Sequence, residues 1–130
     1  MKVRREIKKT KDGKIISAKD YDKKGNCIHI KLSDGTHILY DYDDENREIH
    51  SKDSGGYETW REYDNNGNTI HFKNNKGYES WAEYDDENRL IHIKNSEGLQ
   101  EWYGYDENGI RYIKECISQK YEFTTVFFED

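Results

Sequence analysis

The chain has 130 residues, 32% of them hydrophobic and 37% charged, and its net charge is −6 at pH 7. This length predicts a single domain, residues 1–130. The acidic charge disfavours nucleic acid as a direct partner and favours a basic protein. No apolar run approaches the ~20 residues that a membrane helix needs, so we expect no membrane partner.

The expected compartment is the cytoplasm. The basic start of the chain, residues 1–13, has no apolar run behind it, so it does not look like a signal peptide. Without an export signal, we expect Cys27 and Cys116 to be free thiols in a reducing cytosol.

A repeat of 21 residues organises the chain. Residues 1–20 form a degenerate leading row, which is not numbered, residues 21–104 form four full rows, numbered first to fourth, and residues 105–130 form a partial row with a C-terminal cap. Each row opens on Tyr-Asp, carries Ile-His-x-Lys further on, and closes on Leu or Trp. The matching positions are Tyr21, Tyr42, Tyr63, Tyr84 and Tyr105; Ile28, Ile49, Ile70 and Ile91; His29, His50, His71 and His92; Lys31, Lys52, Lys73 and Lys94; and Leu39, Trp60, Trp81 and Trp102. Aromatic residues in such a register argue against disorder.

Each row predicts a strand, a turn and a second strand. In the third row, Asn68–Lys73 and Tyr78–Tyr84 alternate polar and apolar residues between Gly, Asn and Asp clusters. Summed over the rows, the pattern predicts an all-β fold of about 10–11 antiparallel strands in an up-and-down meander. We expect this sheet to be twisted or curved.

Two turn motifs alternate along the chain. Asp64-Asn65-Asn66-Gly67 is typical of a type I turn closed by a left-handed Gly, with Asn46 and Asn88 taking that place in two rows. The other turn ends on a Gly such as Gly77. Because an odd period would turn every second repeat over, one turn or a bulge must absorb a residue. A three-residue first turn and a two-residue second turn satisfy this, and they predict that the Trp and Ile columns share one, buried face. The Tyr, His and Lys columns then take the other face.

The C-terminal part departs from the repeat. Ile113, Cys116, Ile117 and Lys120-Tyr121 have helical spacing, whereas Phe123–Phe128 has the pattern of a strand. We expect a cap that covers the last edge of the sheet, formed as helix or strand.

The recurrent Tyr-Asp-x-x-Gly-Asn resembles the YD repeats of Rhs and teneurin-like proteins over roughly residues 21–110. Tyr40-x-Tyr42-Asp43 and Tyr103-x-Tyr105-Asp106 have the fuller Tyr-x-Tyr-Asp form. A small acidic protein of this kind is similar to an immunity protein of a bacterial contact-dependent or Rhs-type polymorphic toxin system. The resemblance implies a cognate toxin C-terminal domain as partner.

Catalysis, cofactors and metals are not expected. Equivalent strands of successive rows lie about 9–10 Å apart, so neighbouring members of the His column are too distant to share a metal ion. Carboxylates fall in solvated turns, and no Ser-His-Asp or Cys-His set stands apart from the repeat. The sequence therefore favours a protein that is not an enzyme.

The aromatic columns leave alternatives open. They are compatible with a packed face, with a protein-recognition surface, or with a carbohydrate- or choline-binding module whose aromatic side chains hold a quaternary ammonium group. A structural YD-repeat adaptor is a further alternative.

Two acidic turns are the candidate site. One reading is a solvated edge that discourages aggregation; the other is an acidic edge that occupies the basic substrate groove of a nuclease toxin as a phosphate mimic. The predicted partner-binding residues are Asp43, Asp44, Glu45, Asp85, Asp86 and Glu87, with Tyr42 and Tyr84 close by.

Overall fold

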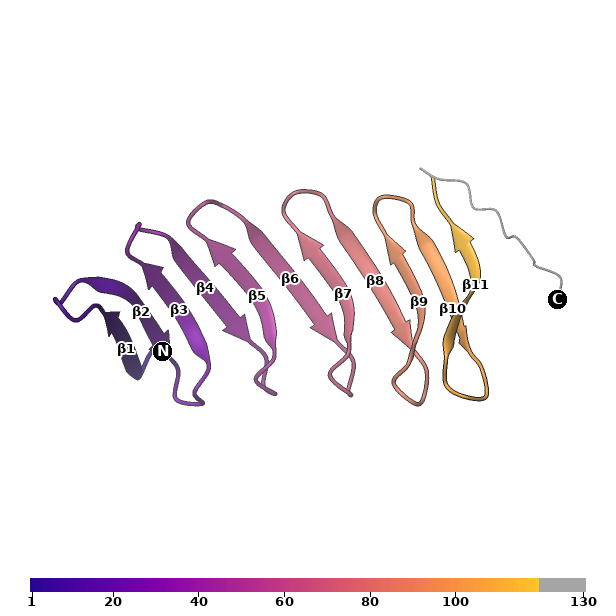
Figure 1. Ribbon diagram of the computed structural model, residues 1–130, viewed down its shortest axis with the longest axis horizontal. Helices are drawn as coiled ribbons and strands as arrows, with labels where there is room; N and C mark the ends of the chain where they lie inside the picture. Colours follow the sequence, from indigo (N-terminus) through magenta and orange to yellow (C-terminus); the bar gives the residue numbers. More distant parts are fainter. Residues whose placement is uncertain (120–130) are drawn as a thin grey trace. The chain divides into compact units, whose positions relative to one another are not determined.

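The structure is a computed structural model that describes residues 1–119. Eleven β-strands follow one another along the chain (Figure 1). Their bounds are β1 Arg4–Lys9, β2 Ile15–Tyr21, β3 Cys27–Leu32, β4 His37–Tyr42, β5 Glu48–Asp53, β6 Glu58–Tyr63, β7 Thr69–Asn74, β8 Glu79–Tyr84, β9 Leu90–Asn95, β10 Gln100–Tyr105 and β11 Arg111–Ile117. The hydrogen-bonding order runs from β1 to β11 without a crossover. The predicted all-β, antiparallel, up-and-down fold is confirmed.

Two compact units divide the chain. The first holds Met1–Glu62 with Lys73–Lys76, and the second holds Tyr63–Phe72 with the described residues from Gly77 onward. The expectation of a single domain stays a prediction.

Both turn motifs form loops of the same length, which corrects one sequence expectation. In the Asp-x-x-Gly turn, the Asp22 N–H donates to the Asn26 carbonyl at 2.9 Å, and the Gly25 N–H donates back to Asp22 at 3.1 Å. In the following turn, the Leu32 N–H donates to the Thr36 carbonyl at 2.9 Å. Three residues therefore lie between the paired ends in each case, and the expected two-residue loop is wrong. Gly25 takes the positive φ, 86°, that closes such a turn.

A β-bulge absorbs the odd residue of the repeat instead. Asp20 lies opposite His29, but its neighbour Tyr21 lies opposite Cys27, so Ile28 is left over. The same shift occurs beside Tyr42 and beside Tyr84. The Ile column thus supplies the extra residue in the bulge, and every row keeps its side chains on the same faces.

The faces differ from the predicted assignment. His50 lies directly opposite Trp60, which places the His and Trp columns on one face. Trp60 and Trp81 are 37% and 39% exposed, so the expected buried Trp face is wrong. The physical reason is the equal length of the two turns, because parity then pairs Trp with His.

Little apolar surface is fully buried in the described part of the chain. Tyr103 is the one hydrophobic residue that is buried there, and Asp20 and Thr59 are the buried polar residues. Contacts between neighbouring strands must therefore carry much of the stability.

The C-terminal prediction is partly corrected. Ile113, Cys116 and Ile117 lie in β11, a strand that pairs with β10, so their helical spacing does not form a helix. The pairing across β10 and β11 decides this, since the edge of β10 offers backbone partners. The expected cap at Lys120-Tyr121 and Phe123–Phe128 lies outside the described residues.

Candidate functional site

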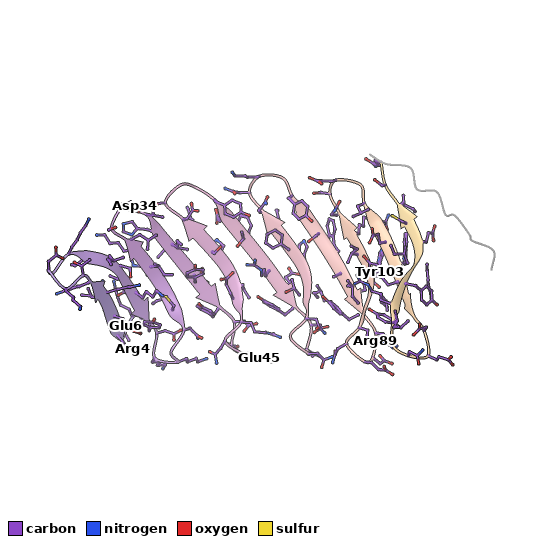
Figure 2. All side chains as sticks on the ribbon, in the orientation of Figure 1. Arg4, Glu6, Asp34, Glu45, Arg89 and Tyr103 are labelled. Carbon is purple, nitrogen blue, oxygen red and sulfur yellow. The ribbon has the colours of Figure 1, made fainter. Side chains whose placement is uncertain are left out.

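The first acidic turn joins β4 to β5, where Figure 2 shows Glu45. The Asp43 Oδ1 accepts the backbone N–H groups of Glu45 and Arg47 at 2.9 and 3.0 Å. Its Oδ2 accepts the Arg47 Nε–H at 2.8 Å. The hydrogen bond from the Arg47 backbone, followed by the Arg47 guanidinium, lowers the pKa of Asp43. Asp43 therefore stabilises its own turn.

The second acidic turn, between β8 and β9, repeats this arrangement. The Asp85 Oδ1 accepts the backbone N–H groups of Glu87 and Arg89, both at 2.9 Å. The Arg89 Nε–H donates to Asp85 Oδ2 at 2.8 Å, and Figure 2 shows Arg89 beside this turn. The backbone hydrogen bond from Arg89 is the main reason that the pKa of Asp85 is lowered.

The remaining acids of both turns face solvent. The side chains of Glu45 and Glu87 are 67% and 73% exposed, and each lies 3.5 or 3.6 Å from the Nη1 of its neighbouring arginine. Asp44 and Asp86 are exposed as well. Each turn thus presents two carboxylates on a loop that its first Asp holds in place.

Arg47 and Arg89 were missed by the sequence reasoning. Both stand four residues after the first Asp of an acidic turn, whereas the corresponding Asn26 and Asn68 occupy this place in the neighbouring rows. That spacing is the signal that could have identified them, because it allows a salt bridge across the turn.

The two predicted tyrosines are half-buried rather than free. The Tyr42 hydroxyl donates to the carbonyl of Cys27 at 2.7 Å, at the bulge of the preceding row. Burial is the main reason that the pKa of Tyr42 is raised to about 12. Tyr105 repeats this contact with the Leu90 carbonyl. Tyr42 and Tyr105 therefore satisfy backbone carbonyls at the bulges.

A groove of about 420 Å³ adjoins the first acidic turn. Tyr42, Asp43 and Asp44 line it together with Lys23 and Lys24 of the preceding turn. The structure thus brings three of the predicted residues to one groove within the first unit. The second predicted set, from Tyr84 to Glu87, lies in the other unit.

Neighbouring turns are linked through the two asparagines with positive φ. Asn46, with φ of 65°, accepts a hydrogen bond from the Asn26 side chain at 2.8 Å. Asn88, with φ of 63°, accepts one from Asn68 at 3.2 Å. These asparagines therefore do more than replace glycine.

The His and Trp columns form a second ordered surface. His50 Nδ1 lies 2.8 Å from Asp41 Oδ2, and its Nε2 lies 2.6 Å from Glu58 Oε2. The His50 ring stacks on Trp60 with centroids 5.5 Å apart. On the other side of this indole, the Lys73 Nζ lies 5.9 Å from the ring centroid.

The same order of side chains recurs in the second unit. His71 and His92 stack on Trp81 and Trp102 with centroid distances of 5.5 and 4.7 Å. The Lys94 Nζ lies 5.7 Å from the Trp81 centroid. Because a His and a Lys contact the rings of Trp60 and Trp81, these two indoles are already used in contacts within the sheet rather than arranged as a cage around a choline group. This arrangement disfavours the carbohydrate- or choline-binding alternative.

The described residues hold no group of three or more His, Cys, Asp or Glu side chains able to bind a metal ion. Among these residues there is also no helix with the length and apolar character needed to cross a membrane.

No family model matches the chain, and no curated protein matches it either. Solved structures of Tc toxin components match the fold of the chain. Part of the Photorhabdus luminescens Tc holotoxin pore matches 75% of this chain, with a TM-score of 0.65 and 18% identity. The TcdB2-TccC3-TEV structure matches 85% of it, with a TM-score of 0.63 and 15% identity. The TcdB2-TccC3-Cdc42 structure matches 79% of it, with a TM-score of 0.62 and 15% identity.

These matches establish a shared fold. The chain spans only 5%, 8% and 7% of the length of the three matched chains. The β-sheet described above is thus a fold that this chain shares with a short part of each of these Tc toxin components.

Proposed function

We propose that this chain is an immunity protein that binds and neutralises a cognate toxin C-terminal domain, a basic nuclease. The observation that carries the proposal is the construction of the acidic turns. In each turn the first Asp is bound by backbone N–H groups and an arginine, while the next two carboxylates face solvent. The fold shared with toxin components supports the context.

The proposed mechanism is occlusion of the substrate groove. A nuclease binds the phosphate backbone through basic residues, and fixed carboxylates can take the place of phosphates there. Asp44, Glu45, Asp86 and Glu87 are the exposed charges that would make such contacts, and Glu45 and Glu87 would exchange their exposed salt bridges to Arg47 and Arg89 for contacts with the toxin. Tyr42 and Tyr84, which are half-buried directly before the acidic residues of each turn, would contribute contacts through the exposed parts of their rings. Inhibition of this kind needs neither catalysis nor a cofactor.

The proposed compartment is the cytoplasm, because a nuclease must be blocked where its nucleic acid substrate is. Co-expression tests the function directly. The toxin domain encoded beside this chain's gene is induced in a bacterial host with and without the chain, and growth and nucleic acid integrity are measured. Protection supports the proposal. Loss of growth despite expression of the folded chain would overturn it.

A structural YD-repeat adaptor is the second candidate. The observation in its favour is that the sheet matches a short part of much longer toxin chains. An adaptor would bind its toxin partner without protecting the host from the toxin's activity. Binding measured beside protection therefore separates the two candidates.

A further inference from the structure

The first row of the His face differs from the other rows at one position. His29 on β3 meets His37 on β4, with the His29 Nε2 and the His37 Nδ1 2.9 Å apart. Their ring centroids lie 5.1 Å apart and the ring planes are inclined by 16°, so the two rings meet edge to edge. The corresponding partners of the later histidines are Glu58, Glu79 and Gln100.

A hydrogen bond between two imidazoles imposes a condition on their protons. One ring nitrogen must carry the hydrogen and the other must offer a lone pair. When both rings are charged, both nitrogens carry a hydrogen, and the bond between His29 and His37 cannot form. Two positive rings would then lie edge to edge next to each other.

The carboxylate that contacts the His29 ring is Asp20, which is already shared, and Asp41 lies two residues after Leu39, the residue opposite His29. The His29 Nδ1 lies 3.3 Å from Asp20 Oδ2 on β2. Asp20 is 2% exposed and also accepts hydrogen bonds from Lys2 and from Arg5 on β1, at 3.1 and 2.6 Å. The Arg5 guanidinium is the main reason that the pKa of Asp20 lies well below its usual range. Asp20 therefore stays ionised in mild acid.

The surroundings of His37 add positive charge. Lys31 on β3 lies directly opposite His37. On β5, Lys52 lies opposite Leu39, the residue two positions after His37. The side chain of Ser54, the residue that follows β5, accepts the His37 backbone N–H. Nothing among these contacts offsets a charge on the His37 ring.

We propose that the His29–His37 pair is an acid-sensitive contact between β3 and β4, which loosens the N-terminal strands when both rings become charged. In the strand order, β1, β2 and β3 reach the rest of the first unit through the pairing of β3 with β4. A weaker β3–β4 contact therefore loosens all three strands. This inference does not depend on the proposed function.

The contacts of the second row favour the opposite response to acid. His50 lies between Asp41 and Glu58, and the hydrogen bond to Asp41 is the main reason that its pKa is raised. Charging His50 satisfies both carboxylates. The response to acid thus depends on the residue that contacts the histidine of each row. The residues found at this position in other rows can therefore be used as substitutions at His37.

Loosening of the N-terminal strands would also affect the groove of the first unit. Met1 and Val3, which precede β1, line that groove together with Tyr42 and Asp44. Loosening of β1 in acid would therefore remove part of the groove wall.

The test uses amide hydrogen exchange of the full chain, followed by NMR and corrected for the intrinsic effect of pH. Protection of β3 and β4 is compared at about pH 7.5 and about pH 5, which bracket the ordinary histidine pKa. The natural chain should lose protection there on the order of 10-fold, equivalent to one pKa unit. Strands β9 and β10 serve as the internal reference, since their His92 faces Gln100.

His37→Gln and His37→Glu are the deciding variants, because Gln100 and Glu58 occupy the same place in other rows. Both should keep the protection of β3 and β4 in acid. The proposal would be overturned if the protection of β3 and β4 in the natural chain did not fall in acid. It would also be overturned if both variants lost as much protection as the natural chain. If either variant fails to fold, Glu58→His provides a second test, since it should make the β5–β6 contact acid-sensitive.

Discussion

His50 and Trp60 lie directly opposite each other on β5 and β6, with their rings stacked at 5.5 Å and inclined by 28°. Asp41 and Glu58 hold the imidazole from both sides, and Lys73 lies beyond the indole. These contacts run across the strands from β4 to β7, and little apolar surface is fully buried in the described part of the chain. Such cross-strand contacts explain how a chain with 32% hydrophobic residues forms a sheet.

Trp60→Ala should lower the free energy of unfolding by about 1–2 kcal/mol, because it removes a half-buried indole and its contacts with His50 and Lys73. Urea unfolding followed by circular dichroism measures this change. Leu39→Ala is the matched control, since Leu39 occupies the same column without ring stacking. A cost for Trp60→Ala no larger than that for Leu39→Ala would contradict the role given to the row.

His50 should titrate above the ordinary histidine pKa of about 6.5. Since the folded pKa is raised, its stabilising contribution is fully present below the unfolded pKa and is lost as the pH rises through the folded pKa. An NMR titration of the imidazole measures it. Asp41→Asn should lower the pKa of His50, because Asp41 is the main cause of the shift. An unchanged pKa in this variant would refute the assignment.

Gly67→Val should cost more than about 1 kcal/mol, because Gly67 has a φ of 86° and a β-branched residue adopts it poorly. No atom lies within 4 Å of an added Cβ, so the cost comes from the backbone alone. Gly67→Asn should cost less, as Asn46 adopts φ of 65° at the equivalent position. Chemical denaturation of the two variants would show equal losses if the turn did not require a positive φ.

Asp43→Ala should destabilise the protein more than Asp44→Ala. Asp43 accepts two backbone N–H groups and the Arg47 side chain, whereas Asp44 is exposed. The folded pKa of Asp43 is depressed, so its contribution is present above its unfolded pKa and is lost as the pH falls through the folded pKa. Thermal unfolding at neutral and acidic pH measures both effects. Equal melting temperatures for the two variants would contradict the assigned role of Asp43.

The strand pattern and the positions of the turns could be predicted because they depend on local chemistry, although the length of the second turn could not. Alternation in segments such as Tyr78–Tyr84, and Gly or Asn at the left-handed positions, determine each hairpin from nearby residues. The side on which Trp60 lies could not be predicted in this way. It depends on whether a turn or the bulge at Ile49 absorbs one residue, and both satisfy the same sequence period.

The positions of the acidic turns could be predicted from the sequence, whereas their role as a partner-binding site stays a prediction. The acidic turns lie at the predicted residues, and Asp44 and Glu45 are exposed as a docking edge requires. The use of Asp43 within its own turn depends on Arg47, a residue that composition alone treats as one more surface charge. The hydroxyl contact of Tyr42 with the bulge likewise follows from the register of a neighbouring strand.

The association rate with the cognate toxin domain tests the central claim most directly. It is measured for the natural chain and for a variant with Asp44→Asn, Glu45→Gln, Asp86→Asn and Glu87→Gln, over a range of salt concentrations. Glu107→Gln, in the turn after β10, is the control. The account predicts that the variant with all four substitutions, the fourfold variant, folds normally but associates more slowly at low salt. Its association rate should lose most of its salt dependence, whereas the association rate of the control should not change. Association of the fourfold variant that is as fast and as salt-dependent as that of the natural chain would contradict the claim.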